Sequence, residues 1–154
     1  MKVQKVYNEL IKNHLKFKKP GVAAKYKGGV IISPDEYRAF IIPENDFILD
    51  FDKLLGGTVQ TKLVAENIIK SSENPNYRDG KLLEKYEVKG DAVGKNKKMI
   101  QAIQSGDETI WVNKKYLDYF DKPKLRTLGY KDPIFVYEED KLVGLVFPVI
   151  NNKL

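Results

Sequence analysis

Residues 109–149 read TIWVNKKYLDYFDKPKLRTLGYKDPIFVYEEDKLVGLVFPV, and this stretch decides the fold class. Its β-branched and aromatic beginning, Thr109–Val112, is typical of a half-buried strand. Asn113 predicts the start of a short helix, because its side chain can accept a hydrogen bond from a free amide of the first turn. Pro123 ends this helix. The apolar face of the helix comprises Tyr116, Leu117 and Phe120. Three further apolar runs predict a meander of strands: Leu125–Tyr130, Ile134–Tyr137 and Leu142–Val146.

The N-terminal third predicts the same order of elements. Lys2–Lys16 has the pattern of an amphipathic helix. The dipeptide Gly28-Gly29 between two apolar runs is a hairpin signal. The expected strands are Val22–Lys27, Val30–Ser33 and Tyr37–Pro43. A helix followed by an antiparallel meander therefore stands at each end of the chain, and Met1–Gln4 is the candidate for a strand ahead of the first helix.

The connection between these two ends has a mixed pattern. Apolar residues at helical spacing, including Met99, Ile100 and Ile103, predict a helix shortly before the last third. The expected elements are a strand at Phe47–Phe51, a helix at Lys62–Ser71, a loop at Ser72–Gly80, a strand at Leu82–Val88 and a helix at Lys95–Ser105.

The 154 residues carry a formal net charge of +6 and contain no cysteine. This length is enough for one domain with a sizeable core. The lack of cysteine excludes disulfides, thiolate metal sites and cysteine catalysis. No apolar run is long enough to span a bilayer and no signal-peptide pattern is present, so we expect a cytoplasmic protein without membrane contact. The positive charge favours a polyanionic partner such as nucleic acid, although the excess of lysine over arginine also fits a lysine-rich proteome.

The order of motifs in the last third resembles the last half-domain of the bacterial DNA polymerase sliding clamp, the β clamp. The matching segments are Val112-Asn113, Tyr116-Leu117-Asp118, Asp132-Pro133-Ile134 and Leu145-Val146-Phe147-Pro148-Val149. Near the N-terminus, Ser33–Ala39 is similar to the Asp-Gly-(His/Tyr)-Arg-Leu turn and strand of that family. Glu36 stands there in place of the family's glycine and Ala39 in place of its leucine.

The resemblance implies an α+β fold with a single domain over residues 1–154. This domain would contain two βαβββ halves, with an antiparallel sheet and the helices on one side of it. Residues 1–43 would form the first half, residues 44–107 an elaborated connection, and residues 108–150 the second half.

The resemblance also implies a non-enzymatic accessory protein of DNA replication, encoded by a phage or mobile element. In sliding clamps the helices face the DNA, and their basic side chains meet phosphates without reading bases. The matching candidates for DNA contact are Lys5, Lys12, Lys16, Lys114 and Lys115. A solvated polar helix face explains the same lysines equally well, because Glu9 lies among them. The implied partners are double-stranded DNA, a DNA polymerase or other replication proteins, and further copies of the chain, since one domain cannot encircle a duplex.

A second implied site is the peptide-binding pocket of the clamp family, which polymerases and repair proteins use. The matching positions are Tyr37, Arg38, Leu145, Phe147, Pro148 and Val149. A bound peptide would place apolar side chains against these residues. The competing interpretation is that Leu145 and Phe147 alternate into the core of the last strand, and for Phe147 we favour it.

Patterns for catalysis and metal binding are weak. Gly90–Asn96 is one residue short of the P-loop spacing and lacks the Ser or Thr that would hold magnesium. Asp50 and Asp52 alternate on one strand face, but a metal would need further ligands. We therefore expect no enzyme activity, no cofactor and no metal. The alternative function is a monomeric interaction protein that uses the clamp fold without DNA contact, and an enzyme with an unfamiliar site comes third.

Overall fold

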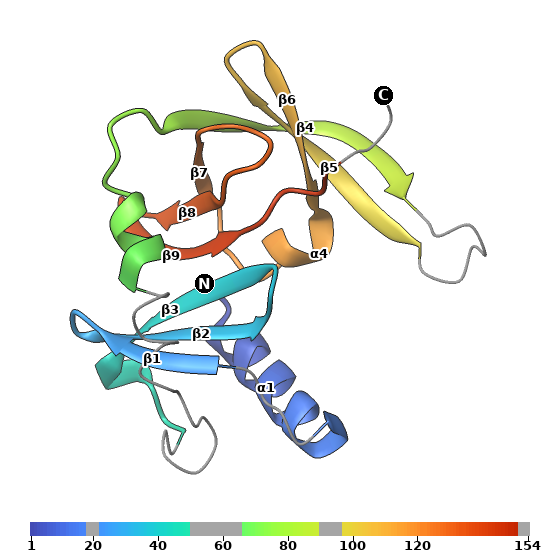
Figure 1. Cartoon of the computed structure of the whole chain (residues 1–154). Coiled ribbons are helices and arrows are strands. Elements are labelled where there is room, and N and C mark those ends of the chain that lie inside the picture. The colour runs from blue at the N-terminus through green and yellow to red at the C-terminus, as the bar shows by residue number, and fades with distance from the viewer. Residues whose placement is uncertain (18–21, 50–65, 90–96, 151–154) are drawn as a thin grey trace.

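A computed structural model describes residues 1–17, 22–49, 66–89 and 97–150 (Figure 1). Within these ranges the chain has an α+β fold built on one antiparallel nine-stranded sheet, in the order β1-β2-β3-β9-β8-β7-β4-β5-β6. The strands are β1 (Val22–Tyr26), β2 (Gly29–Asp35), β3 (Arg38–Pro43), β4 (Arg78–Lys89), β5 (Lys98–Ser105), β6 (Glu108–Asn113), β7 (Lys124–Thr127), β8 (Ile134–Glu138) and β9 (Lys141–Val146). The helical elements are α1 (Val3–Phe17), the 3₁₀ turn η1 (Glu44–Asp46), α4 (Lys114–Leu117) and residues 66–71.

The predicted helix and meander at the N-terminus are confirmed as α1 followed by β1, β2 and β3. The hairpin between β1 and β2 turns at Lys27 and Gly28, one residue earlier than the predicted Gly28-Gly29, and the φ angles of these two residues are 41° and 76°. Glycine adopts this left-handed region without steric cost, which is why the sequence signal was reliable here. The strand expected at Met1–Gln4 is wrong, because Val3 already belongs to α1.

The C-terminal prediction is also confirmed in its order, which is β6, α4, β7, β8 and β9. The helix is shorter than expected and ends at Leu117. Strand β7 ends at Thr127 and not at Tyr130, because the Thr127 hydroxyl accepts a hydrogen bond from the Gly129 amide at 3.2 Å and forms a turn.

The connection contains the clearest error, because the helix predicted at Lys95–Ser105 is the strand β5 from Lys98 onward. Its apolar positions fit both periods: Ile100 and Ala102 are buried on one face of the strand, and Ile103 is buried on the other. Pairing with β4 on one side and β6 on the other overrides the local helical pattern.

The other predictions for the connection are confirmed only in part. Strand β4 is longer than expected and begins at Arg78, inside the predicted loop. The helix predicted at Lys62–Ser71 is present at residues 66–71, and its first residues lie outside the described ranges. Phe47–Leu49 is not a strand, and the rest of that predicted strand also lies outside the described ranges.

The two faces of the sheet have separate apolar cores. On one face, called the helix face, α1 and α4 pack against Val30 and Ile32 of β2, Phe40 and Ile42 of β3, and Ile134 and Val136 of β8. On the opposite face, Ile68 and Ile69 of the helical residues 66–71 pack in a second cluster with Ile31 and Phe135. The expectation that the helices lie on one side of the sheet is therefore correct for α1 and α4 and wrong for residues 66–71.

Two features set the outline of the molecule. Strand β9 joins the N-terminal and C-terminal strands by pairing with β3 at Arg38, Ala39 and Phe40. Strands β4 and β5 continue past the core as a two-stranded ribbon that extends from the body (Figure 1). The exposed apolar side chains of this ribbon are Tyr86, Val88 and Met99.

Candidate nucleic-acid interface

Helix α1 is held on the sheet by its apolar side. Its buried side chains are Val6, Tyr7 and Leu10. The Tyr7 hydroxyl donates a hydrogen bond to the Asp46 carbonyl at 2.7 Å. The Lys2 amide donates to the Tyr119 carbonyl at 2.7 Å, so the start of α1 is tied to the segment after α4. The polar side of α1 is consequently turned to solvent.

Helix α4 is short, and its position is fixed by its first residues and by one buried side chain. The Asn113 side chain accepts a hydrogen bond from the Lys115 amide at 3.1 Å, as the sequence predicts for an N-cap. Leu117 is buried in the core of the helix face. With the helix held in this way, Lys115 is exposed and Lys114 is half-buried.

The predicted lysines of the two helices meet at Asp118. The Lys114 Nζ atom lies 3.1 Å from Asp118 Oδ1. The Lys5 Nζ atom donates to the Asp118 carbonyl at 3.5 Å and lies 4.4 Å from the centre of the Tyr119 ring. Lys2 Nζ donates to the same carbonyl at 3.0 Å. The fold therefore brings Lys5 and Lys114 together, and the Asp118 carboxylate offsets part of their charge.

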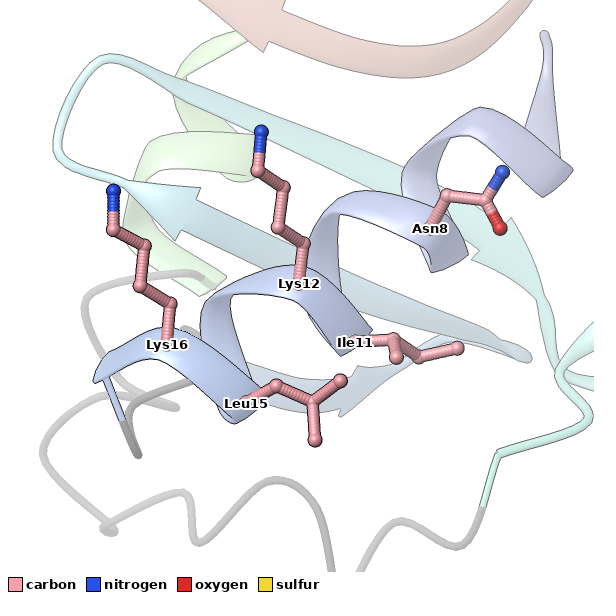
Figure 2. A pocket seen from close by; sticks show the side chains of 5 residues that line it. All are labelled: Asn8, Ile11, Lys12, Leu15 and Lys16. Atoms are coloured by element: carbon pink, nitrogen blue, oxygen red, sulfur yellow. The ribbon is translucent and has the colours of Figure 1, made fainter.

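Lys12 and Lys16 lie further along α1 and extend side by side from it (Figure 2). Among the described residues, the side chains of Lys12 and Lys115 have no hydrogen-bond or ion-pair partner. All five predicted lysines belong to the two helices that pack on the helix face, and we call them together the basic surface: Lys5, Lys12, Lys16, Lys114 and Lys115.

Glu9, which the sequence places among these lysines, is directed inward. Its carboxylate accepts hydrogen bonds from the guanidinium of Arg38 and from the Tyr119 hydroxyl. Its side chain keeps only 20% of its accessible surface. Glu9 was the reason for interpreting the lysine side of α1 as a solvated polar face. Its carboxylate instead binds Arg38 and Tyr119 inside the fold.

Arg38 is the centre of a buried polar network that the sequence did not predict. Its side chain is 8% exposed, and its Nε donates to Asp35 Oδ2 at 2.9 Å. Its guanidinium carbon lies 4.8 Å from the centre of the Tyr116 ring and 5.0 Å from that of Tyr119. Planar contact with two rings and pairing with two carboxylates are the conditions under which a guanidinium tolerates burial.

The same environment changes the protonation of the network. Burial raises the pKa of Tyr119, and its hydrogen bond to the Glu9 carboxylate raises it further, because that bond requires the neutral phenol. Burial alone would lower the pKa of Arg38, but the charges of Asp35 and Glu9 reverse the direction and raise it. Arg38 is therefore a permanent cation, and the network links α1, β3 and the segment after α4.

The residues predicted for a peptide pocket are only partly brought together. Tyr37 is 52% exposed and accepts a hydrogen bond at its carbonyl from the Phe147 amide at 2.7 Å. Arg38 is buried in the network on the helix face, and Leu145 is buried in the core of the opposite face. Neither side chain lines an open pocket with Tyr37 in this structure, and the peptide site stays a prediction. Phe147 is half-buried against the same opposite-face core, as the competing interpretation had it. Pro148 and Val149 follow as half-exposed residues, and the Val149 amide donates to Trp111.

No group of three or more acidic or histidine side chains that could hold a metal occurs in the part of the chain that the structure describes. The earlier candidates, Asp50 with Asp52 and the loop Gly90–Asn96, lie outside those ranges. None of the described helices combines the length and the apolar character that crossing a membrane requires.

Comparison with known proteins identifies no relative: no family model, no curated protein and no solved structure matches this chain. The function is therefore inferred from the charge and exposure of the chain's own surface residues.

Proposed function

We propose that this chain is a non-enzymatic DNA-binding accessory protein of the sliding-clamp type, acting in DNA replication with a polymerase or other replication proteins. The observation that carries the proposal is the basic surface. Its lysines come from two helices that are far apart in the sequence and pack on the same face of the sheet, and the Glu9 carboxylate among the lysines of α1 is turned inward. Lysine ammonium groups bind phosphates as point charges, so this surface suits a DNA backbone of any sequence.

The order of elements at the two ends supports the same proposal. Each end has a helix followed by a three-stranded meander, and the meanders join through β3 and β9. Both helices lie on the helix face, which in a clamp of several copies would be the inner, DNA-facing side. One domain cannot encircle a duplex, so this function requires several copies of the chain.

The test measures how retention of double-stranded DNA depends on salt. We expect affinity to fall steeply as salt rises, because bound lysines release counterions from the DNA. The decisive variant is Lys12→Glu with Lys115→Glu, which changes one lysine on each helix and removes no side-chain hydrogen bond or ion pair among the described residues. Each lost phosphate contact should reduce the salt slope by about 1.

The matched control is Lys70→Glu with Lys81→Glu, which changes the net charge equally but lies outside α1 and α4. Equal loss of DNA retention in both double variants would mean that net charge, and not the basic surface, attracts DNA. No loss in the Lys12 and Lys115 variant would reject the proposed interface.

The second candidate is a monomeric interaction protein without DNA contact. The exposed apolar side chains of the ribbon favour it, because Tyr86, Val88 and Met99 lie on one face of that ribbon and phosphate binding does not need them. The mass of the protein in solution separates the two candidates.

A further inference from the structure

Helix α1 carries an exposed apolar stripe that neither the core nor the basic surface uses. Ile11 and Leu15 are four residues apart and therefore lie one turn apart on the same side of the helix. Ile11 is 43% exposed, and Leu15, at 78%, is the most exposed large apolar side chain in the described ranges. The buried residues of α1 lie on a different side of the helix.

The stripe borders a shallow, open hollow of about 500 Å³, and the described residues that line this hollow all belong to α1. Figure 2 shows its lining: Asn8, Ile11, Lys12, Leu15 and Lys16. Ile11 and Leu15 point to one side of the helix, and the two lysines extend from the neighbouring side. The hollow therefore offers two apolar contacts next to a basic border.

We propose that this hollow binds an acidic amphipathic helix of a partner protein. The leucine-type side chains of the partner would cover Ile11 and Leu15, and its carboxylates would pair with Lys12 and Lys16. In such a contact, apolar anchors at helical spacing give affinity and charged flanks fix the orientation of the bound helix.

The positive charges of Lys12 and Lys16, together with the apolar stripe, favour an acidic helix over a second copy of the chain, DNA or a lipid surface. A second copy of the same hollow would bring the lysines of both copies together, and like charges at an interface are strongly unfavourable. DNA phosphates would contact Lys12 and Lys16 but leave Ile11 and Leu15 uncovered. A lipid surface is disfavoured because the larger apolar side of α1 is already buried in the core.

The probe is a labelled synthetic peptide of Glu, Ala and Leu, with leucines at i, i+3, i+4 and i+7. Fluorescence anisotropy gives its Kd, and amide shifts in NMR spectra of the whole chain locate its site. We expect shifts centred on residues 8–16. Ile11→Ser with Leu15→Ser should weaken binding by about tenfold or more, because two apolar contacts are lost.

Three controls make the result decisive. A peptide with Lys in place of Glu should not bind, and a peptide with the same composition but scrambled leucines should bind far more weakly. DNA retention should be unchanged in the double serine variant. The peptide proposal can then fail while the DNA proposal holds, and the DNA proposal can fail while the peptide proposal holds.

Several outcomes would overturn the inference. One is an unchanged Kd in the double serine variant, and another is equal binding of the scrambled peptide. A large fall in the denaturation midpoint of the serine variant would mean that the chain itself covers the stripe. Binding to anionic lipid vesicles that depends on Ile11 and Leu15, without peptide binding, would assign the hollow to a membrane surface instead.

Discussion

At the scale of single residues, Arg38 and its partner Glu9 connect the two ends of the chain. Its partner Glu9 is 29 residues away in the sequence, and Glu9 in turn binds Tyr119, 110 residues away. A buried guanidinium is tolerated only while its carboxylates remain in place. The network therefore fixes the relative positions of α1, β3 and the segment after α4. This effect is separate from its contribution to the free energy of unfolding.

Arg38→Met tests this role, because it leaves Glu9 and Asp35 without their cation. We expect the free energy of unfolding to fall by about 3–5 kcal/mol, the usual cost of removing one partner from a buried ion pair. Urea denaturation measures it. Combining Arg38→Met with Glu9→Met should cost less than the sum of the single changes, since no isolated carboxylate then remains at that position. Strict additivity would mean that the two side chains do not interact.

Tyr119 gives the network a pH dependence. A pKa raised in the folded state means that the unfolded chain loses its phenolic proton first. The contribution of Tyr119 to stability is thus complete below the ordinary tyrosine pKa of about 10 and is lost as the pH rises through the folded-state value. We expect the free energy of unfolding to fall above about pH 10.

The control for this prediction is Tyr119→Phe, which should show a smaller decline. Some decline should persist in that variant, because burial also raises the pKa of Tyr7, Tyr77 and Tyr116. Identical pH profiles for the parent chain and the variant would show that Tyr119 does not contribute.

At the scale of elements, the sequence predicted correctly those turns and helix ends that depend only on neighbouring residues. The hairpin at Gly28, the cap at Asn113 and the turns of the last meander all involve residues close together in the chain. Strand β5 could not be found in this way, because its conformation depends on pairing with β4 and β6. The packing of residues 66–71 on the opposite face is equally a long-range property.

The junction of β3 and β9 is the most sensitive point between elements. A Cβ atom at Gly144 would lie 2.5 Å from the Ala39 carbonyl oxygen and 3.0 Å from the Phe120 ring. Gly144→Ala must therefore push β9 away from β3, where only three residue pairs hold the strands together. We expect a loss of about 1–3 kcal/mol, typical of overpacking, measured as a lower thermal midpoint.

Gly28→Ala is the matched glycine control for the β3–β9 junction. A Cβ atom there meets nothing within 4 Å, so its cost comes from the positive φ alone. That cost is about 1 kcal/mol, and it should leave the signals of β3 and β9 unchanged. If Gly144→Ala costs no more than Gly28→Ala, the close approach at the junction is relieved without moving the strands.

At the scale of the whole molecule, the sequence predicted the exposure of the lysines on α1 better than the burial of Arg38 and Leu145. Lysines on an amphipathic helix remain exposed in almost any fold, so their side of α1 could be inferred from periodicity. Arg38 and Leu145 depend on which strands become central in the sheet. The resemblance that placed both in a pocket could not supply that information, and they are buried.

The proposed function finally requires more than one copy, and the edges of the sheet show how copies could join. Strands β1 and β6 are the two ends of the sheet, and the Val149 amide already donates to Trp111 of β6. Among the described residues, strand β1 is therefore the freer edge, and in its two-residue hairpin the Lys25 amide points away from β2.

We expect light scattering to give a mass that is a multiple of 17.7 kDa. Lys25→Pro should reduce that mass to one chain by removing the outward donor, because proline on an edge strand blocks further pairing. Lys25→Ala removes the same side chain and its exposed contact with Glu44 but keeps the amide, so it should remain assembled. A single-chain mass for the parent protein would reject a clamp of several copies and leave the monomeric interaction protein as the function that its surfaces support.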